Sequence, residues 1–262
     1  MSPSPSVDAD LTRLLKRLKL GQMLPTLPER LTLARAKQLD YTAFLTLLLA
    51  DEVQRRDHQA LERRLIAAGF EDLVTLDDVD WASPVALDRR QLQQLFTLEF
   101  LARKEHVILV GPVGVGKTML AQCLGAATVR AGRSVVFARA DALLKELGQA
   151  RADHSFERTF RRYLAPDLLI VDDFGLHRLT AQQSQDLYEL VVERHRRASF
   201  VLTSNRAVDE WLGLFDDPIL GNSALDRLAN AAHQLVLDGP SYRARLAPKH
   251  REQRGQPQEA SR

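Results

Sequence analysis

Residues Gly111–Thr118 (GPVGVGKT) constrain the fold of this chain more than any other stretch of its sequence. They match the pattern G-x-x-x-x-G-K-[ST], whose glycines let backbone N–H groups surround the oxygens of a phosphate. An apolar run, Val107–Val110, comes directly before the loop, and an apolar pattern with helical spacing, Met119–Leu124, follows it. A strand, a phosphate-binding loop and a helix in this order predict a nucleoside triphosphate site in an α/β domain.

The residues of this loop have distinct expected roles. Lys117 is predicted to hold the β- and γ-phosphates, and the hydroxyl of Thr118 is predicted to ligate Mg²⁺. The glycines allow the backbone to approach the ligand closely, and the helix that follows offers its positive N-terminal end. The residues expected to bind ATP here are Gly111, Pro112, Val113, Gly114, Val115, Gly116, Lys117 and Thr118.

Two further stretches have the composition of a nucleotide site. Leu168–Asp173 is an apolar run that ends in two carboxylates; Asp172 is predicted to hold Mg²⁺ through water, as in a Walker-B strand, and Asp173 to polarise the attacking water. Val201–Asn205 is an apolar run that delivers Asn205, a candidate for positioning water or the γ-phosphate. Asp-Asp and Asn are also common in turns, so these roles depend on the loop at Gly111–Thr118.

Apolar runs alternate with helical patterns from residue 107 onward, which predicts a parallel, doubly wound sheet. We expect strands at 107–110, 134–138, 168–171, 200–203 and 233–237, and helices at 117–131, 140–150, 156–164, 181–197 and 224–231.

The remainder of the chain divides by composition. We expect a flexible tail (1–9), a small all-helical domain (10–70), a connector (71–87), the ATPase domain (88–240) and a basic tail (241–262) without a C-terminal lid domain. In the helical domain we expect helices from Asp10, as N-cap, to a stop at Gly21, then at 28–39 and 42–68, and in the ATPase domain a helix at 88–103. The first of these helices is rich in Lys and Arg. It can contact DNA, but we favour an ordinary amphipathic helix with a solvated face.

Composition excludes several classes of protein. Cys123 is the only cysteine, so neither a disulfide framework nor a cysteine-rich metal site is expected. The net charge of +2 is too small to indicate nucleic-acid binding through the charge of the whole molecule. Residues 241–262, however, contain six Lys and Arg against two Glu. We see no apolar run near 18 residues and no signal core, and therefore expect a cytoplasmic protein without a membrane segment.

Nearly the whole chain resembles AAA+ ATPases of the IstB/DnaC type, with the IstB branch the closer match. The stretches that carry the resemblance are Leu87–Arg90, Val107–Thr118, Asp167–Gly175, Leu202–Asn205, Asp217–Leu220, Leu225–Leu228 and Ser241–Arg243. The resemblance implies an ATP-dependent helper of a two-gene insertion sequence, which binds and remodels duplex DNA as a homo-oligomer and recruits or stimulates its transposase.

The resemblance also implies roles for individual residues. Lys117 and Thr118 match the Walker-A pair, Asp172 and Asp173 the Walker-B pair, and Asn205 matches sensor 1. Arg227 matches the arginine supplied to a neighbouring subunit's ATP, with a surface ion pair as the alternative, and Arg243 is a candidate sensor 2. Many AAA+ proteins carry Glu where Asp173 stands, so fast hydrolysis is less firmly implied than binding.

Two alternatives remain open at this point. A DnaC-like helicase loader would use its N-terminal helices to hold a replicative helicase, with ATP as a switch. A small-molecule P-loop kinase would need a substrate-binding insertion and an Arg-rich lid, and the sequence shows neither.

Overall fold

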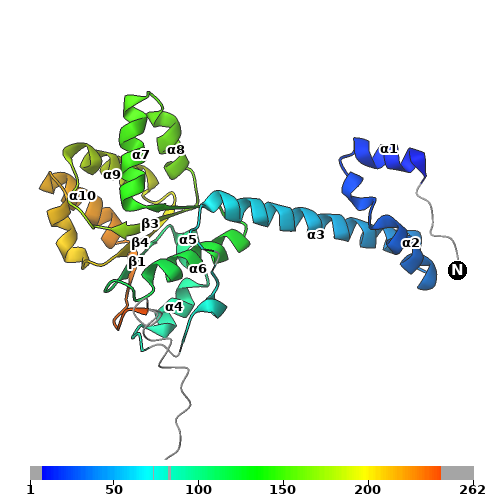
Figure 1. Cartoon of the computed structure of the whole chain (residues 1–262), viewed down its shortest axis with the longest axis horizontal. Helices are drawn as coiled ribbons and strands as arrows, with labels where there is room; N and C mark the ends of the chain where they lie inside the picture. The colour runs from blue at the N-terminus through cyan, green and yellow to red at the C-terminus, as the bar shows by residue number, and fades with distance from the viewer. Residues whose placement is uncertain (1–7, 73, 82–83, 243–262) are drawn as a thin grey trace, which may run out of the picture. The chain divides into compact units, whose positions relative to one another are not determined.

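The computed structural model describes residues 8–72, 74–81 and 84–242 (Figure 1). Its contacts divide the chain into one unit that ends at Arg63 and a second that begins at Arg64. Each unit is described by itself. The residues expected as a connector, 71–87, therefore belong to the second unit, where Leu76–Asp78 forms a 3-10 helix and Ala86 pairs with Asp238.

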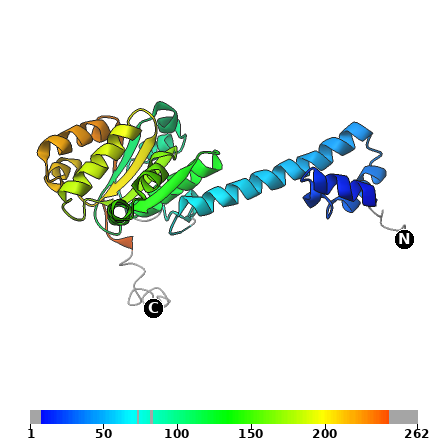
Figure 2. The ribbon, with the colours of Figure 1, turned by 90° about the horizontal axis from the view of Figure 1, so that it is seen from above.

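The first unit is entirely helical in its described residues (Figure 2). Its elements are α1 (Ala9–Arg17), η1 (Gly21–Met23), α2 (Leu27–Ala36) and α3 (Tyr41–Ala68), whose last residues lie beyond the boundary. A small core joins them, formed by Leu15, Met23, Leu27 and Leu48. Buried Glu52 accepts hydrogen bonds from Arg55 and Arg56, which lower its pKa to about 2 although burial opposes them.

The ends of α1 differ from the prediction. Asp10 is not the N-cap, because the helix begins at Ala9 after Asp8, and the Asp10 carboxylate instead pairs with Arg13 at 2.8 Å. Gly21 is not the stop either; α1 ends at Arg17 and Gly21 opens η1. A carboxylate anywhere in the first turn interacts favourably with the positive end of the helix dipole. The sequence alone therefore could not determine which residue begins the helix.

The second unit is built on a five-stranded sheet in the order β2-β3-β4-β1-β5, and every pairing is parallel. The strands are β1 (His106–Val110), β2 (Val135–Arg139), β3 (Leu168–Phe174), β4 (Ser199–Ser204) and β5 (Ala232–Val236). The predicted parallel, doubly wound fold is confirmed.

Helices alternate with these strands. They are α6 (Lys117–Arg130), α7 (Ala140–Ala152), α8 (Phe156–Leu164), α9 (Ala181–Arg194) and α10 (Pro218–Ala229). The single helix predicted at 88–103 is wrong: α4 (Arg89–Leu95) and α5 (Glu99–Arg103) are separated at Leu98, whose φ of 61° is left-handed. A 3-10 helix, η3 (Val208–Leu214), was also not predicted.

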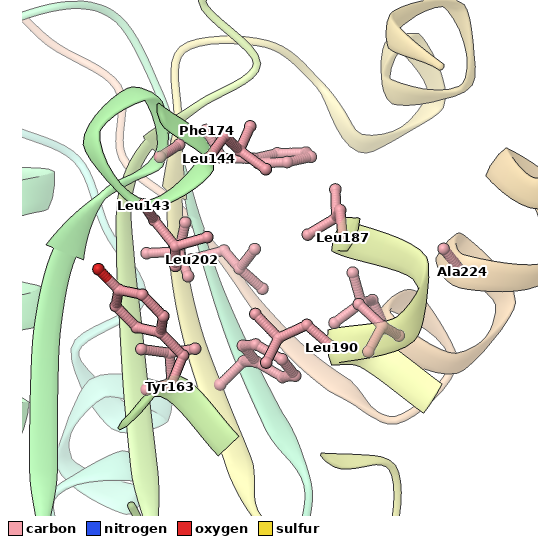
Figure 3. Close-up of a cluster of buried hydrophobic side chains, with 14 of the residues drawn as sticks. Leu143, Leu144, Tyr163, Phe174, Leu187, Leu190, Leu202 and Ala224 are labelled. Atoms are coloured by element: carbon pink, nitrogen blue, oxygen red, sulfur yellow. The ribbon is translucent and has the colours of Figure 1, made fainter. Parts of the chain in front are cut away.

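The main core lies between one face of the sheet and helices α7 to α10. Figure 3 shows the facing side chains of Leu143 and Leu144 from α7, Tyr163 from α8, Phe174 and Leu202 from the sheet, and Leu187, Leu190 and Ala224 from α9 and α10. On β3, Leu169 and Val171 join this cluster, whereas Ile170 lies against Gly125 of α6. Because neighbouring residues of a strand face opposite sides, α6 covers the other face.

This topology brings the predicted loop, the carboxylate pair and Asn205 to one edge of the sheet. The carboxyl ends of parallel strands meet at the same edge of a sheet, and β4 lies between β1 and β3. The loop after β1, the end of β3 and the residue after β4 therefore become neighbours. None of the described helices is both long enough and apolar enough to cross a membrane.

Candidate nucleotide-binding site

The loop between β1 and α6 has the close backbone packing that its glycines predict. A Cβ at Gly111 would lie 2.1 Å from the carbonyl oxygen of Leu237, and one at Gly114, where φ is +84°, would lie 2.1 Å from Oγ of Ser241. Both positions accept glycine alone without a shift of the backbone or of Ser241. The segment after β5 therefore packs directly on the phosphate-binding loop.

The side chain of Lys117 is held inside this loop. Its exposed fraction is 6%, and Nζ donates 2.8 Å hydrogen bonds to the carbonyl oxygens of Gly111 and Pro112. These bonds fix the ammonium group in the concave side of the loop, beside the N-terminal end of α6. Two positive features, the ammonium and the helix end, thus point at the same place.

Asp172 is buried at the end of β3, and both of its carboxylate oxygens are hydrogen-bonded. Thr118 Oγ1 donates to Oδ2 at 3.1 Å, and Thr203 Oγ1 donates to Oδ1 at 2.6 Å. Burial raises the pKa of Asp172 above its usual value, and the two hydroxyl donors oppose that rise. Sequence reasoning missed Thr203; its signal was a polar residue directly after the apolar run Phe200–Leu202 of strand β4.

Asp173 follows in a left-handed conformation, with φ of 55°, at a point where the register between β3 and β4 shifts. Asp tolerates this conformation better than most residues. Its N–H donates to Thr203 Oγ1 at 2.9 Å, and its carboxylate lies 3.7 Å from Nη2 of Arg139. The turn separates the two neighbouring carboxylates, so that Asp172 is buried behind Thr118 and Asp173 faces the pocket.

One pocket collects most of the predicted residues. Lys117, Thr118, Asp173 and Asn205 line it together, as expected from the sheet topology. Residues that were not predicted line it too, namely Glu71, Asp72, Val74, Met119, Gln122, Leu176 and Tyr242. Buried Gln122 accepts a hydrogen bond from the N–H of Asp72 at 3.0 Å, which explains how the segment after α3 is fixed here. We call this space the phosphate pocket.

A second, more apolar pocket adjoins the first. We call it the apolar pocket; it is lined by Asp78, Val79, Asp80, Trp81, Val85, Leu87, Arg89, Val115, Gly116, Met119, Leu120, Leu237 and Tyr242. Arg89 orders one wall of it by donating to the carbonyl oxygen of Trp81 at 2.9 Å, with the guanidinium 5.7 Å from the indole ring. Gly116, Met119 and Tyr242 line both pockets.

The two arginine candidates are not in this cluster. Arg227 lies half-buried on α10, where Nη1 donates to the carbonyl oxygen and to Oγ of Ser223, both at 2.6 Å, and it lines neither pocket. Arg243 lies outside the described residues.

The oxygen atoms at Thr118 and Asp172 fit a magnesium ion. No group of three or more His, Cys, Asp or Glu side chains within the described ranges could hold a metal. Mg²⁺ does not require one, because it keeps several waters and takes one or two protein ligands together with the phosphates of its nucleotide. The hydroxyl and carboxylate here, 3.1 Å apart, supply that smaller set.

Comparisons with known proteins concern the chain as a whole. The family model described as "IstB-like ATP binding protein" matches residues 13–250. An ATP-binding protein in an insertion sequence of Mycobacterium tuberculosis is 44% identical over 92% of this chain and 96% of its own length. The ATP-binding protein of an insertion sequence from Pseudomonas aeruginosa is 34% identical over 89% of this chain and 88% of its own.

Solved structures share the fold. The crystal structure of DnaI has a TM-score of 0.52 and 18% identity, and the alignment covers 63% of this chain and 90% of DnaI. AMPPCP-bound DnaA from Aquifex aeolicus has a TM-score of 0.52 and 16% identity, with 72% and 58% of the two chains covered. At these identities the likeness concerns the P-loop AAA+ fold alone.

Proposed function

This chain belongs to the family of IstB-like ATP-binding proteins, and we propose that it is an ATPase that assembles on duplex DNA and assists a transposase. The observation that carries the proposal is the convergence of Lys117, Thr118, Asp173 and Asn205 on one pocket, while Arg227 lines no pocket of its own chain's site. The proposal assigns these residues to the chain's own half of the site, and the arginine that reaches the γ-phosphate to a neighbouring subunit.

The two pockets divide a nucleoside triphosphate between them. The triphosphate occupies the phosphate pocket, where Lys117 exchanges its bonds to the loop carbonyls for phosphate oxygens. The base occupies the apolar pocket, whose walls of Trp81, Leu87 and Met119 suit a flat aromatic ring. Magnesium, when bound, neutralises charge on the β- and γ-phosphates, and Thr118 and Asp172 would hold it.

Hydrolysis requires that a water be oriented toward the γ-phosphate. Asp173 is the carboxylate that can accept the proton of this water, and Asn205 can orient it from the end of β4. The carboxylate of Asp173 is also engaged in a 3.7 Å ion pair with Arg139. Asp is also one methylene shorter than Glu. Both features favour slow turnover that assembly, DNA or transposase accelerates.

Arg227 supports an oligomer with ATP between subunits. Its guanidinium lies on α10, half-exposed, and donates hydrogen bonds to Ser223 one turn earlier on the same helix. We propose that it reaches the phosphate pocket of a neighbouring copy. An arginine supplied in this way is worth about 10³–10⁵ in rate in other P-loop enzymes.

Two classes of partner have to be distinguished. Relatives named as insertion-sequence proteins, at up to 44% identity over most of the chain, favour a transposase. The likeness to DnaI, at 18% identity, concerns the fold and gives no separate support to a helicase loader.

The test compares wild type, Lys117→Ala and Lys145→Ala. Lys145 is an exposed lysine on α7 that lines neither pocket, so it is a matched control for the loss of charge. We expect wild type and Lys145→Ala to sediment as larger species and to shift duplex DNA only with a slowly hydrolysed ATP analogue, and Lys117→Ala to do neither. Pull-down against the cognate transposase and against a replicative helicase then identifies the partner. ATP that changes neither assembly nor DNA affinity of the wild type would overturn the proposal.

A further inference from the structure

The residues after β5 form a strap across the phosphate-binding loop. The strap begins at Leu237, whose N–H donates to the carbonyl oxygen of Val110 at 2.8 Å, and it ends at Tyr242, whose N–H donates to the carbonyl oxygen of Gly114, also at 2.8 Å. On its other side Asp238 exchanges two backbone hydrogen bonds with Ala86, of 2.7 and 3.0 Å. Backbone hydrogen bonds thus hold the strap on both of its edges, and they restrict the position of Tyr242.

Tyr242 occupies an unusual position between the two pockets. Apart from Gly116 and Met119, which belong to the loop and its helix, it is the one described residue that lines both. It is partly buried, and it is the one aromatic residue among the described residues that line the phosphate pocket. A nucleotide that places its base in one pocket and its phosphates in the other passes the residues that line both, and Tyr242 is the aromatic one among them.

We infer that Tyr242 is a nucleoside-contacting residue of this site, whose ring packs on the ribose and the adjoining edge of the base. This inference rests on the proposed nucleotide site. It assigns the ring to recognition of the nucleoside and the backbone N–H to the shape of the loop at Gly114. Removing an aromatic ring that packs on a sugar or a base weakens the binding of the ligand about tenfold.

The ring should affect the binding of ATP but not that of inorganic tripolyphosphate, which has the phosphates but no nucleoside. In titration calorimetry of the full chain with Mg²⁺, Tyr242→Ala should bind ATP about tenfold more weakly and tripolyphosphate as wild type does. Tyr242→Phe keeps the ring and the backbone bond and should bind both ligands as wild type does. Tyr41→Ala, which removes a tyrosine that is 91% exposed in the first unit, is the control and should change neither.

Thermal unfolding without ligand shows whether each variant is folded, and Tyr242→Leu, which fills the space without a ring, replaces Tyr242→Ala if that variant is not. If the variant without the ring binds ATP and tripolyphosphate more weakly by the same factor, the ring only shapes the loop, and the inference is overturned. Unchanged binding of ATP would overturn it as well. A failure of the proposed function would give a different result. Wild type would then bind neither ATP nor tripolyphosphate, and Lys117→Ala would not differ from wild type.

Discussion

Thr203 Oγ1 donates a 2.6 Å hydrogen bond to Oδ1 of Asp172, from the neighbouring strand of the sheet. The same oxygen accepts the N–H of Asp173 at 2.9 Å, so one hydroxyl fixes both members of the carboxylate pair. Thr118 holds the other oxygen of Asp172. The end of β3 is therefore ordered by residues from β4 and α6 rather than by its own sequence.

Replacing Thr203 by Val tests this arrangement. Valine has the same shape, but the buried carboxylate of Asp172 loses a donor and the N–H of Asp173 loses its acceptor. We expect a loss of about 1–3 kcal/mol in the free energy of unfolding, and weaker Mg²⁺-dependent ATP binding because the pKa of Asp172 rises further. Urea unfolding and ATP titrations with and without Mg²⁺ measure both effects. Thr203→Ser restores the hydroxyl and should behave as wild type; a Val variant equal to wild type would contradict the role.

Gly114→Ala and Gly132→Ala form a matched pair. Their φ angles are +84° and +80°, so a Cβ costs about 1 kcal/mol of backbone strain at either position. At Gly132 the new atom meets nothing within 4 Å, whereas at Gly114 it meets Oγ of Ser241 at 2.1 Å. We expect both variants to be slightly destabilised in thermal unfolding and only Gly114→Ala to lose ATP affinity. Equal ATP affinity of the two would show that the strap does not constrain the loop.

Arg227→Ala separates nucleotide binding from what a neighbour contributes. Because Arg227 lines neither pocket of its own chain, ATP affinity should remain that of wild type. ATP-dependent assembly or turnover should fall, and turnover should fall by about 10³–10⁵-fold if the side chain reaches a neighbour's γ-phosphate. Arg197→Ala removes an exposed arginine paired with Glu193 and is the control. Calorimetry, sedimentation and phosphate release measure the three properties, and an Arg227 variant unchanged in the last two would exclude a shared site.

His106 should make the second unit sensitive to acid. Its side chain is 1% exposed, and Nδ1 accepts the N–H of Phe200 at 3.2 Å, which requires an unprotonated nitrogen. Burial, with smaller contributions from the charges of His195 and Arg194, lowers its pKa from 6.5 to about 4. The unfolded chain therefore binds this proton first as pH falls. The stabilisation is fully present above pH 6.5 and is lost between pH 6.5 and about 4, by an amount on the order of 3 kcal/mol.

The measurement is urea unfolding of wild type and His106→Asn across this range. Asn offers an oxygen acceptor to Phe200 but does not titrate, so its stability should fall less between pH 7 and pH 4. The comparison of slopes removes the contribution of every other titrating group. Parallel loss of stability in the two proteins would contradict the assignment.

Much of the fold could be predicted because its signals are local. The loop at Gly111–Thr118, the apolar runs of β1, β3 and β4, and the helices between them follow from spacing within short windows. The sequence-based predictions were wrong where the local sequence pattern is compatible with more than one backbone structure. The stretch 88–103 has continuous helical spacing, yet Leu98 adopts a left-handed conformation that only packing can impose.

The sequence by itself determined the chemistry of the loop, since Lys117 and Thr118 follow it within one turn of α6 and their placement needs no distant contact. It also determined that a carboxylate pair and Asn205 end apolar strands. Tertiary structure alone decided that β4 lies between β1 and β3, that Thr203 donates to Asp172, and that the N–H of Tyr242 donates to the carbonyl oxygen of Gly114. The physical reason is that the order of parallel strands is set by which faces bury the most apolar surface together. That property belongs to the whole sheet and is not contained in any single segment.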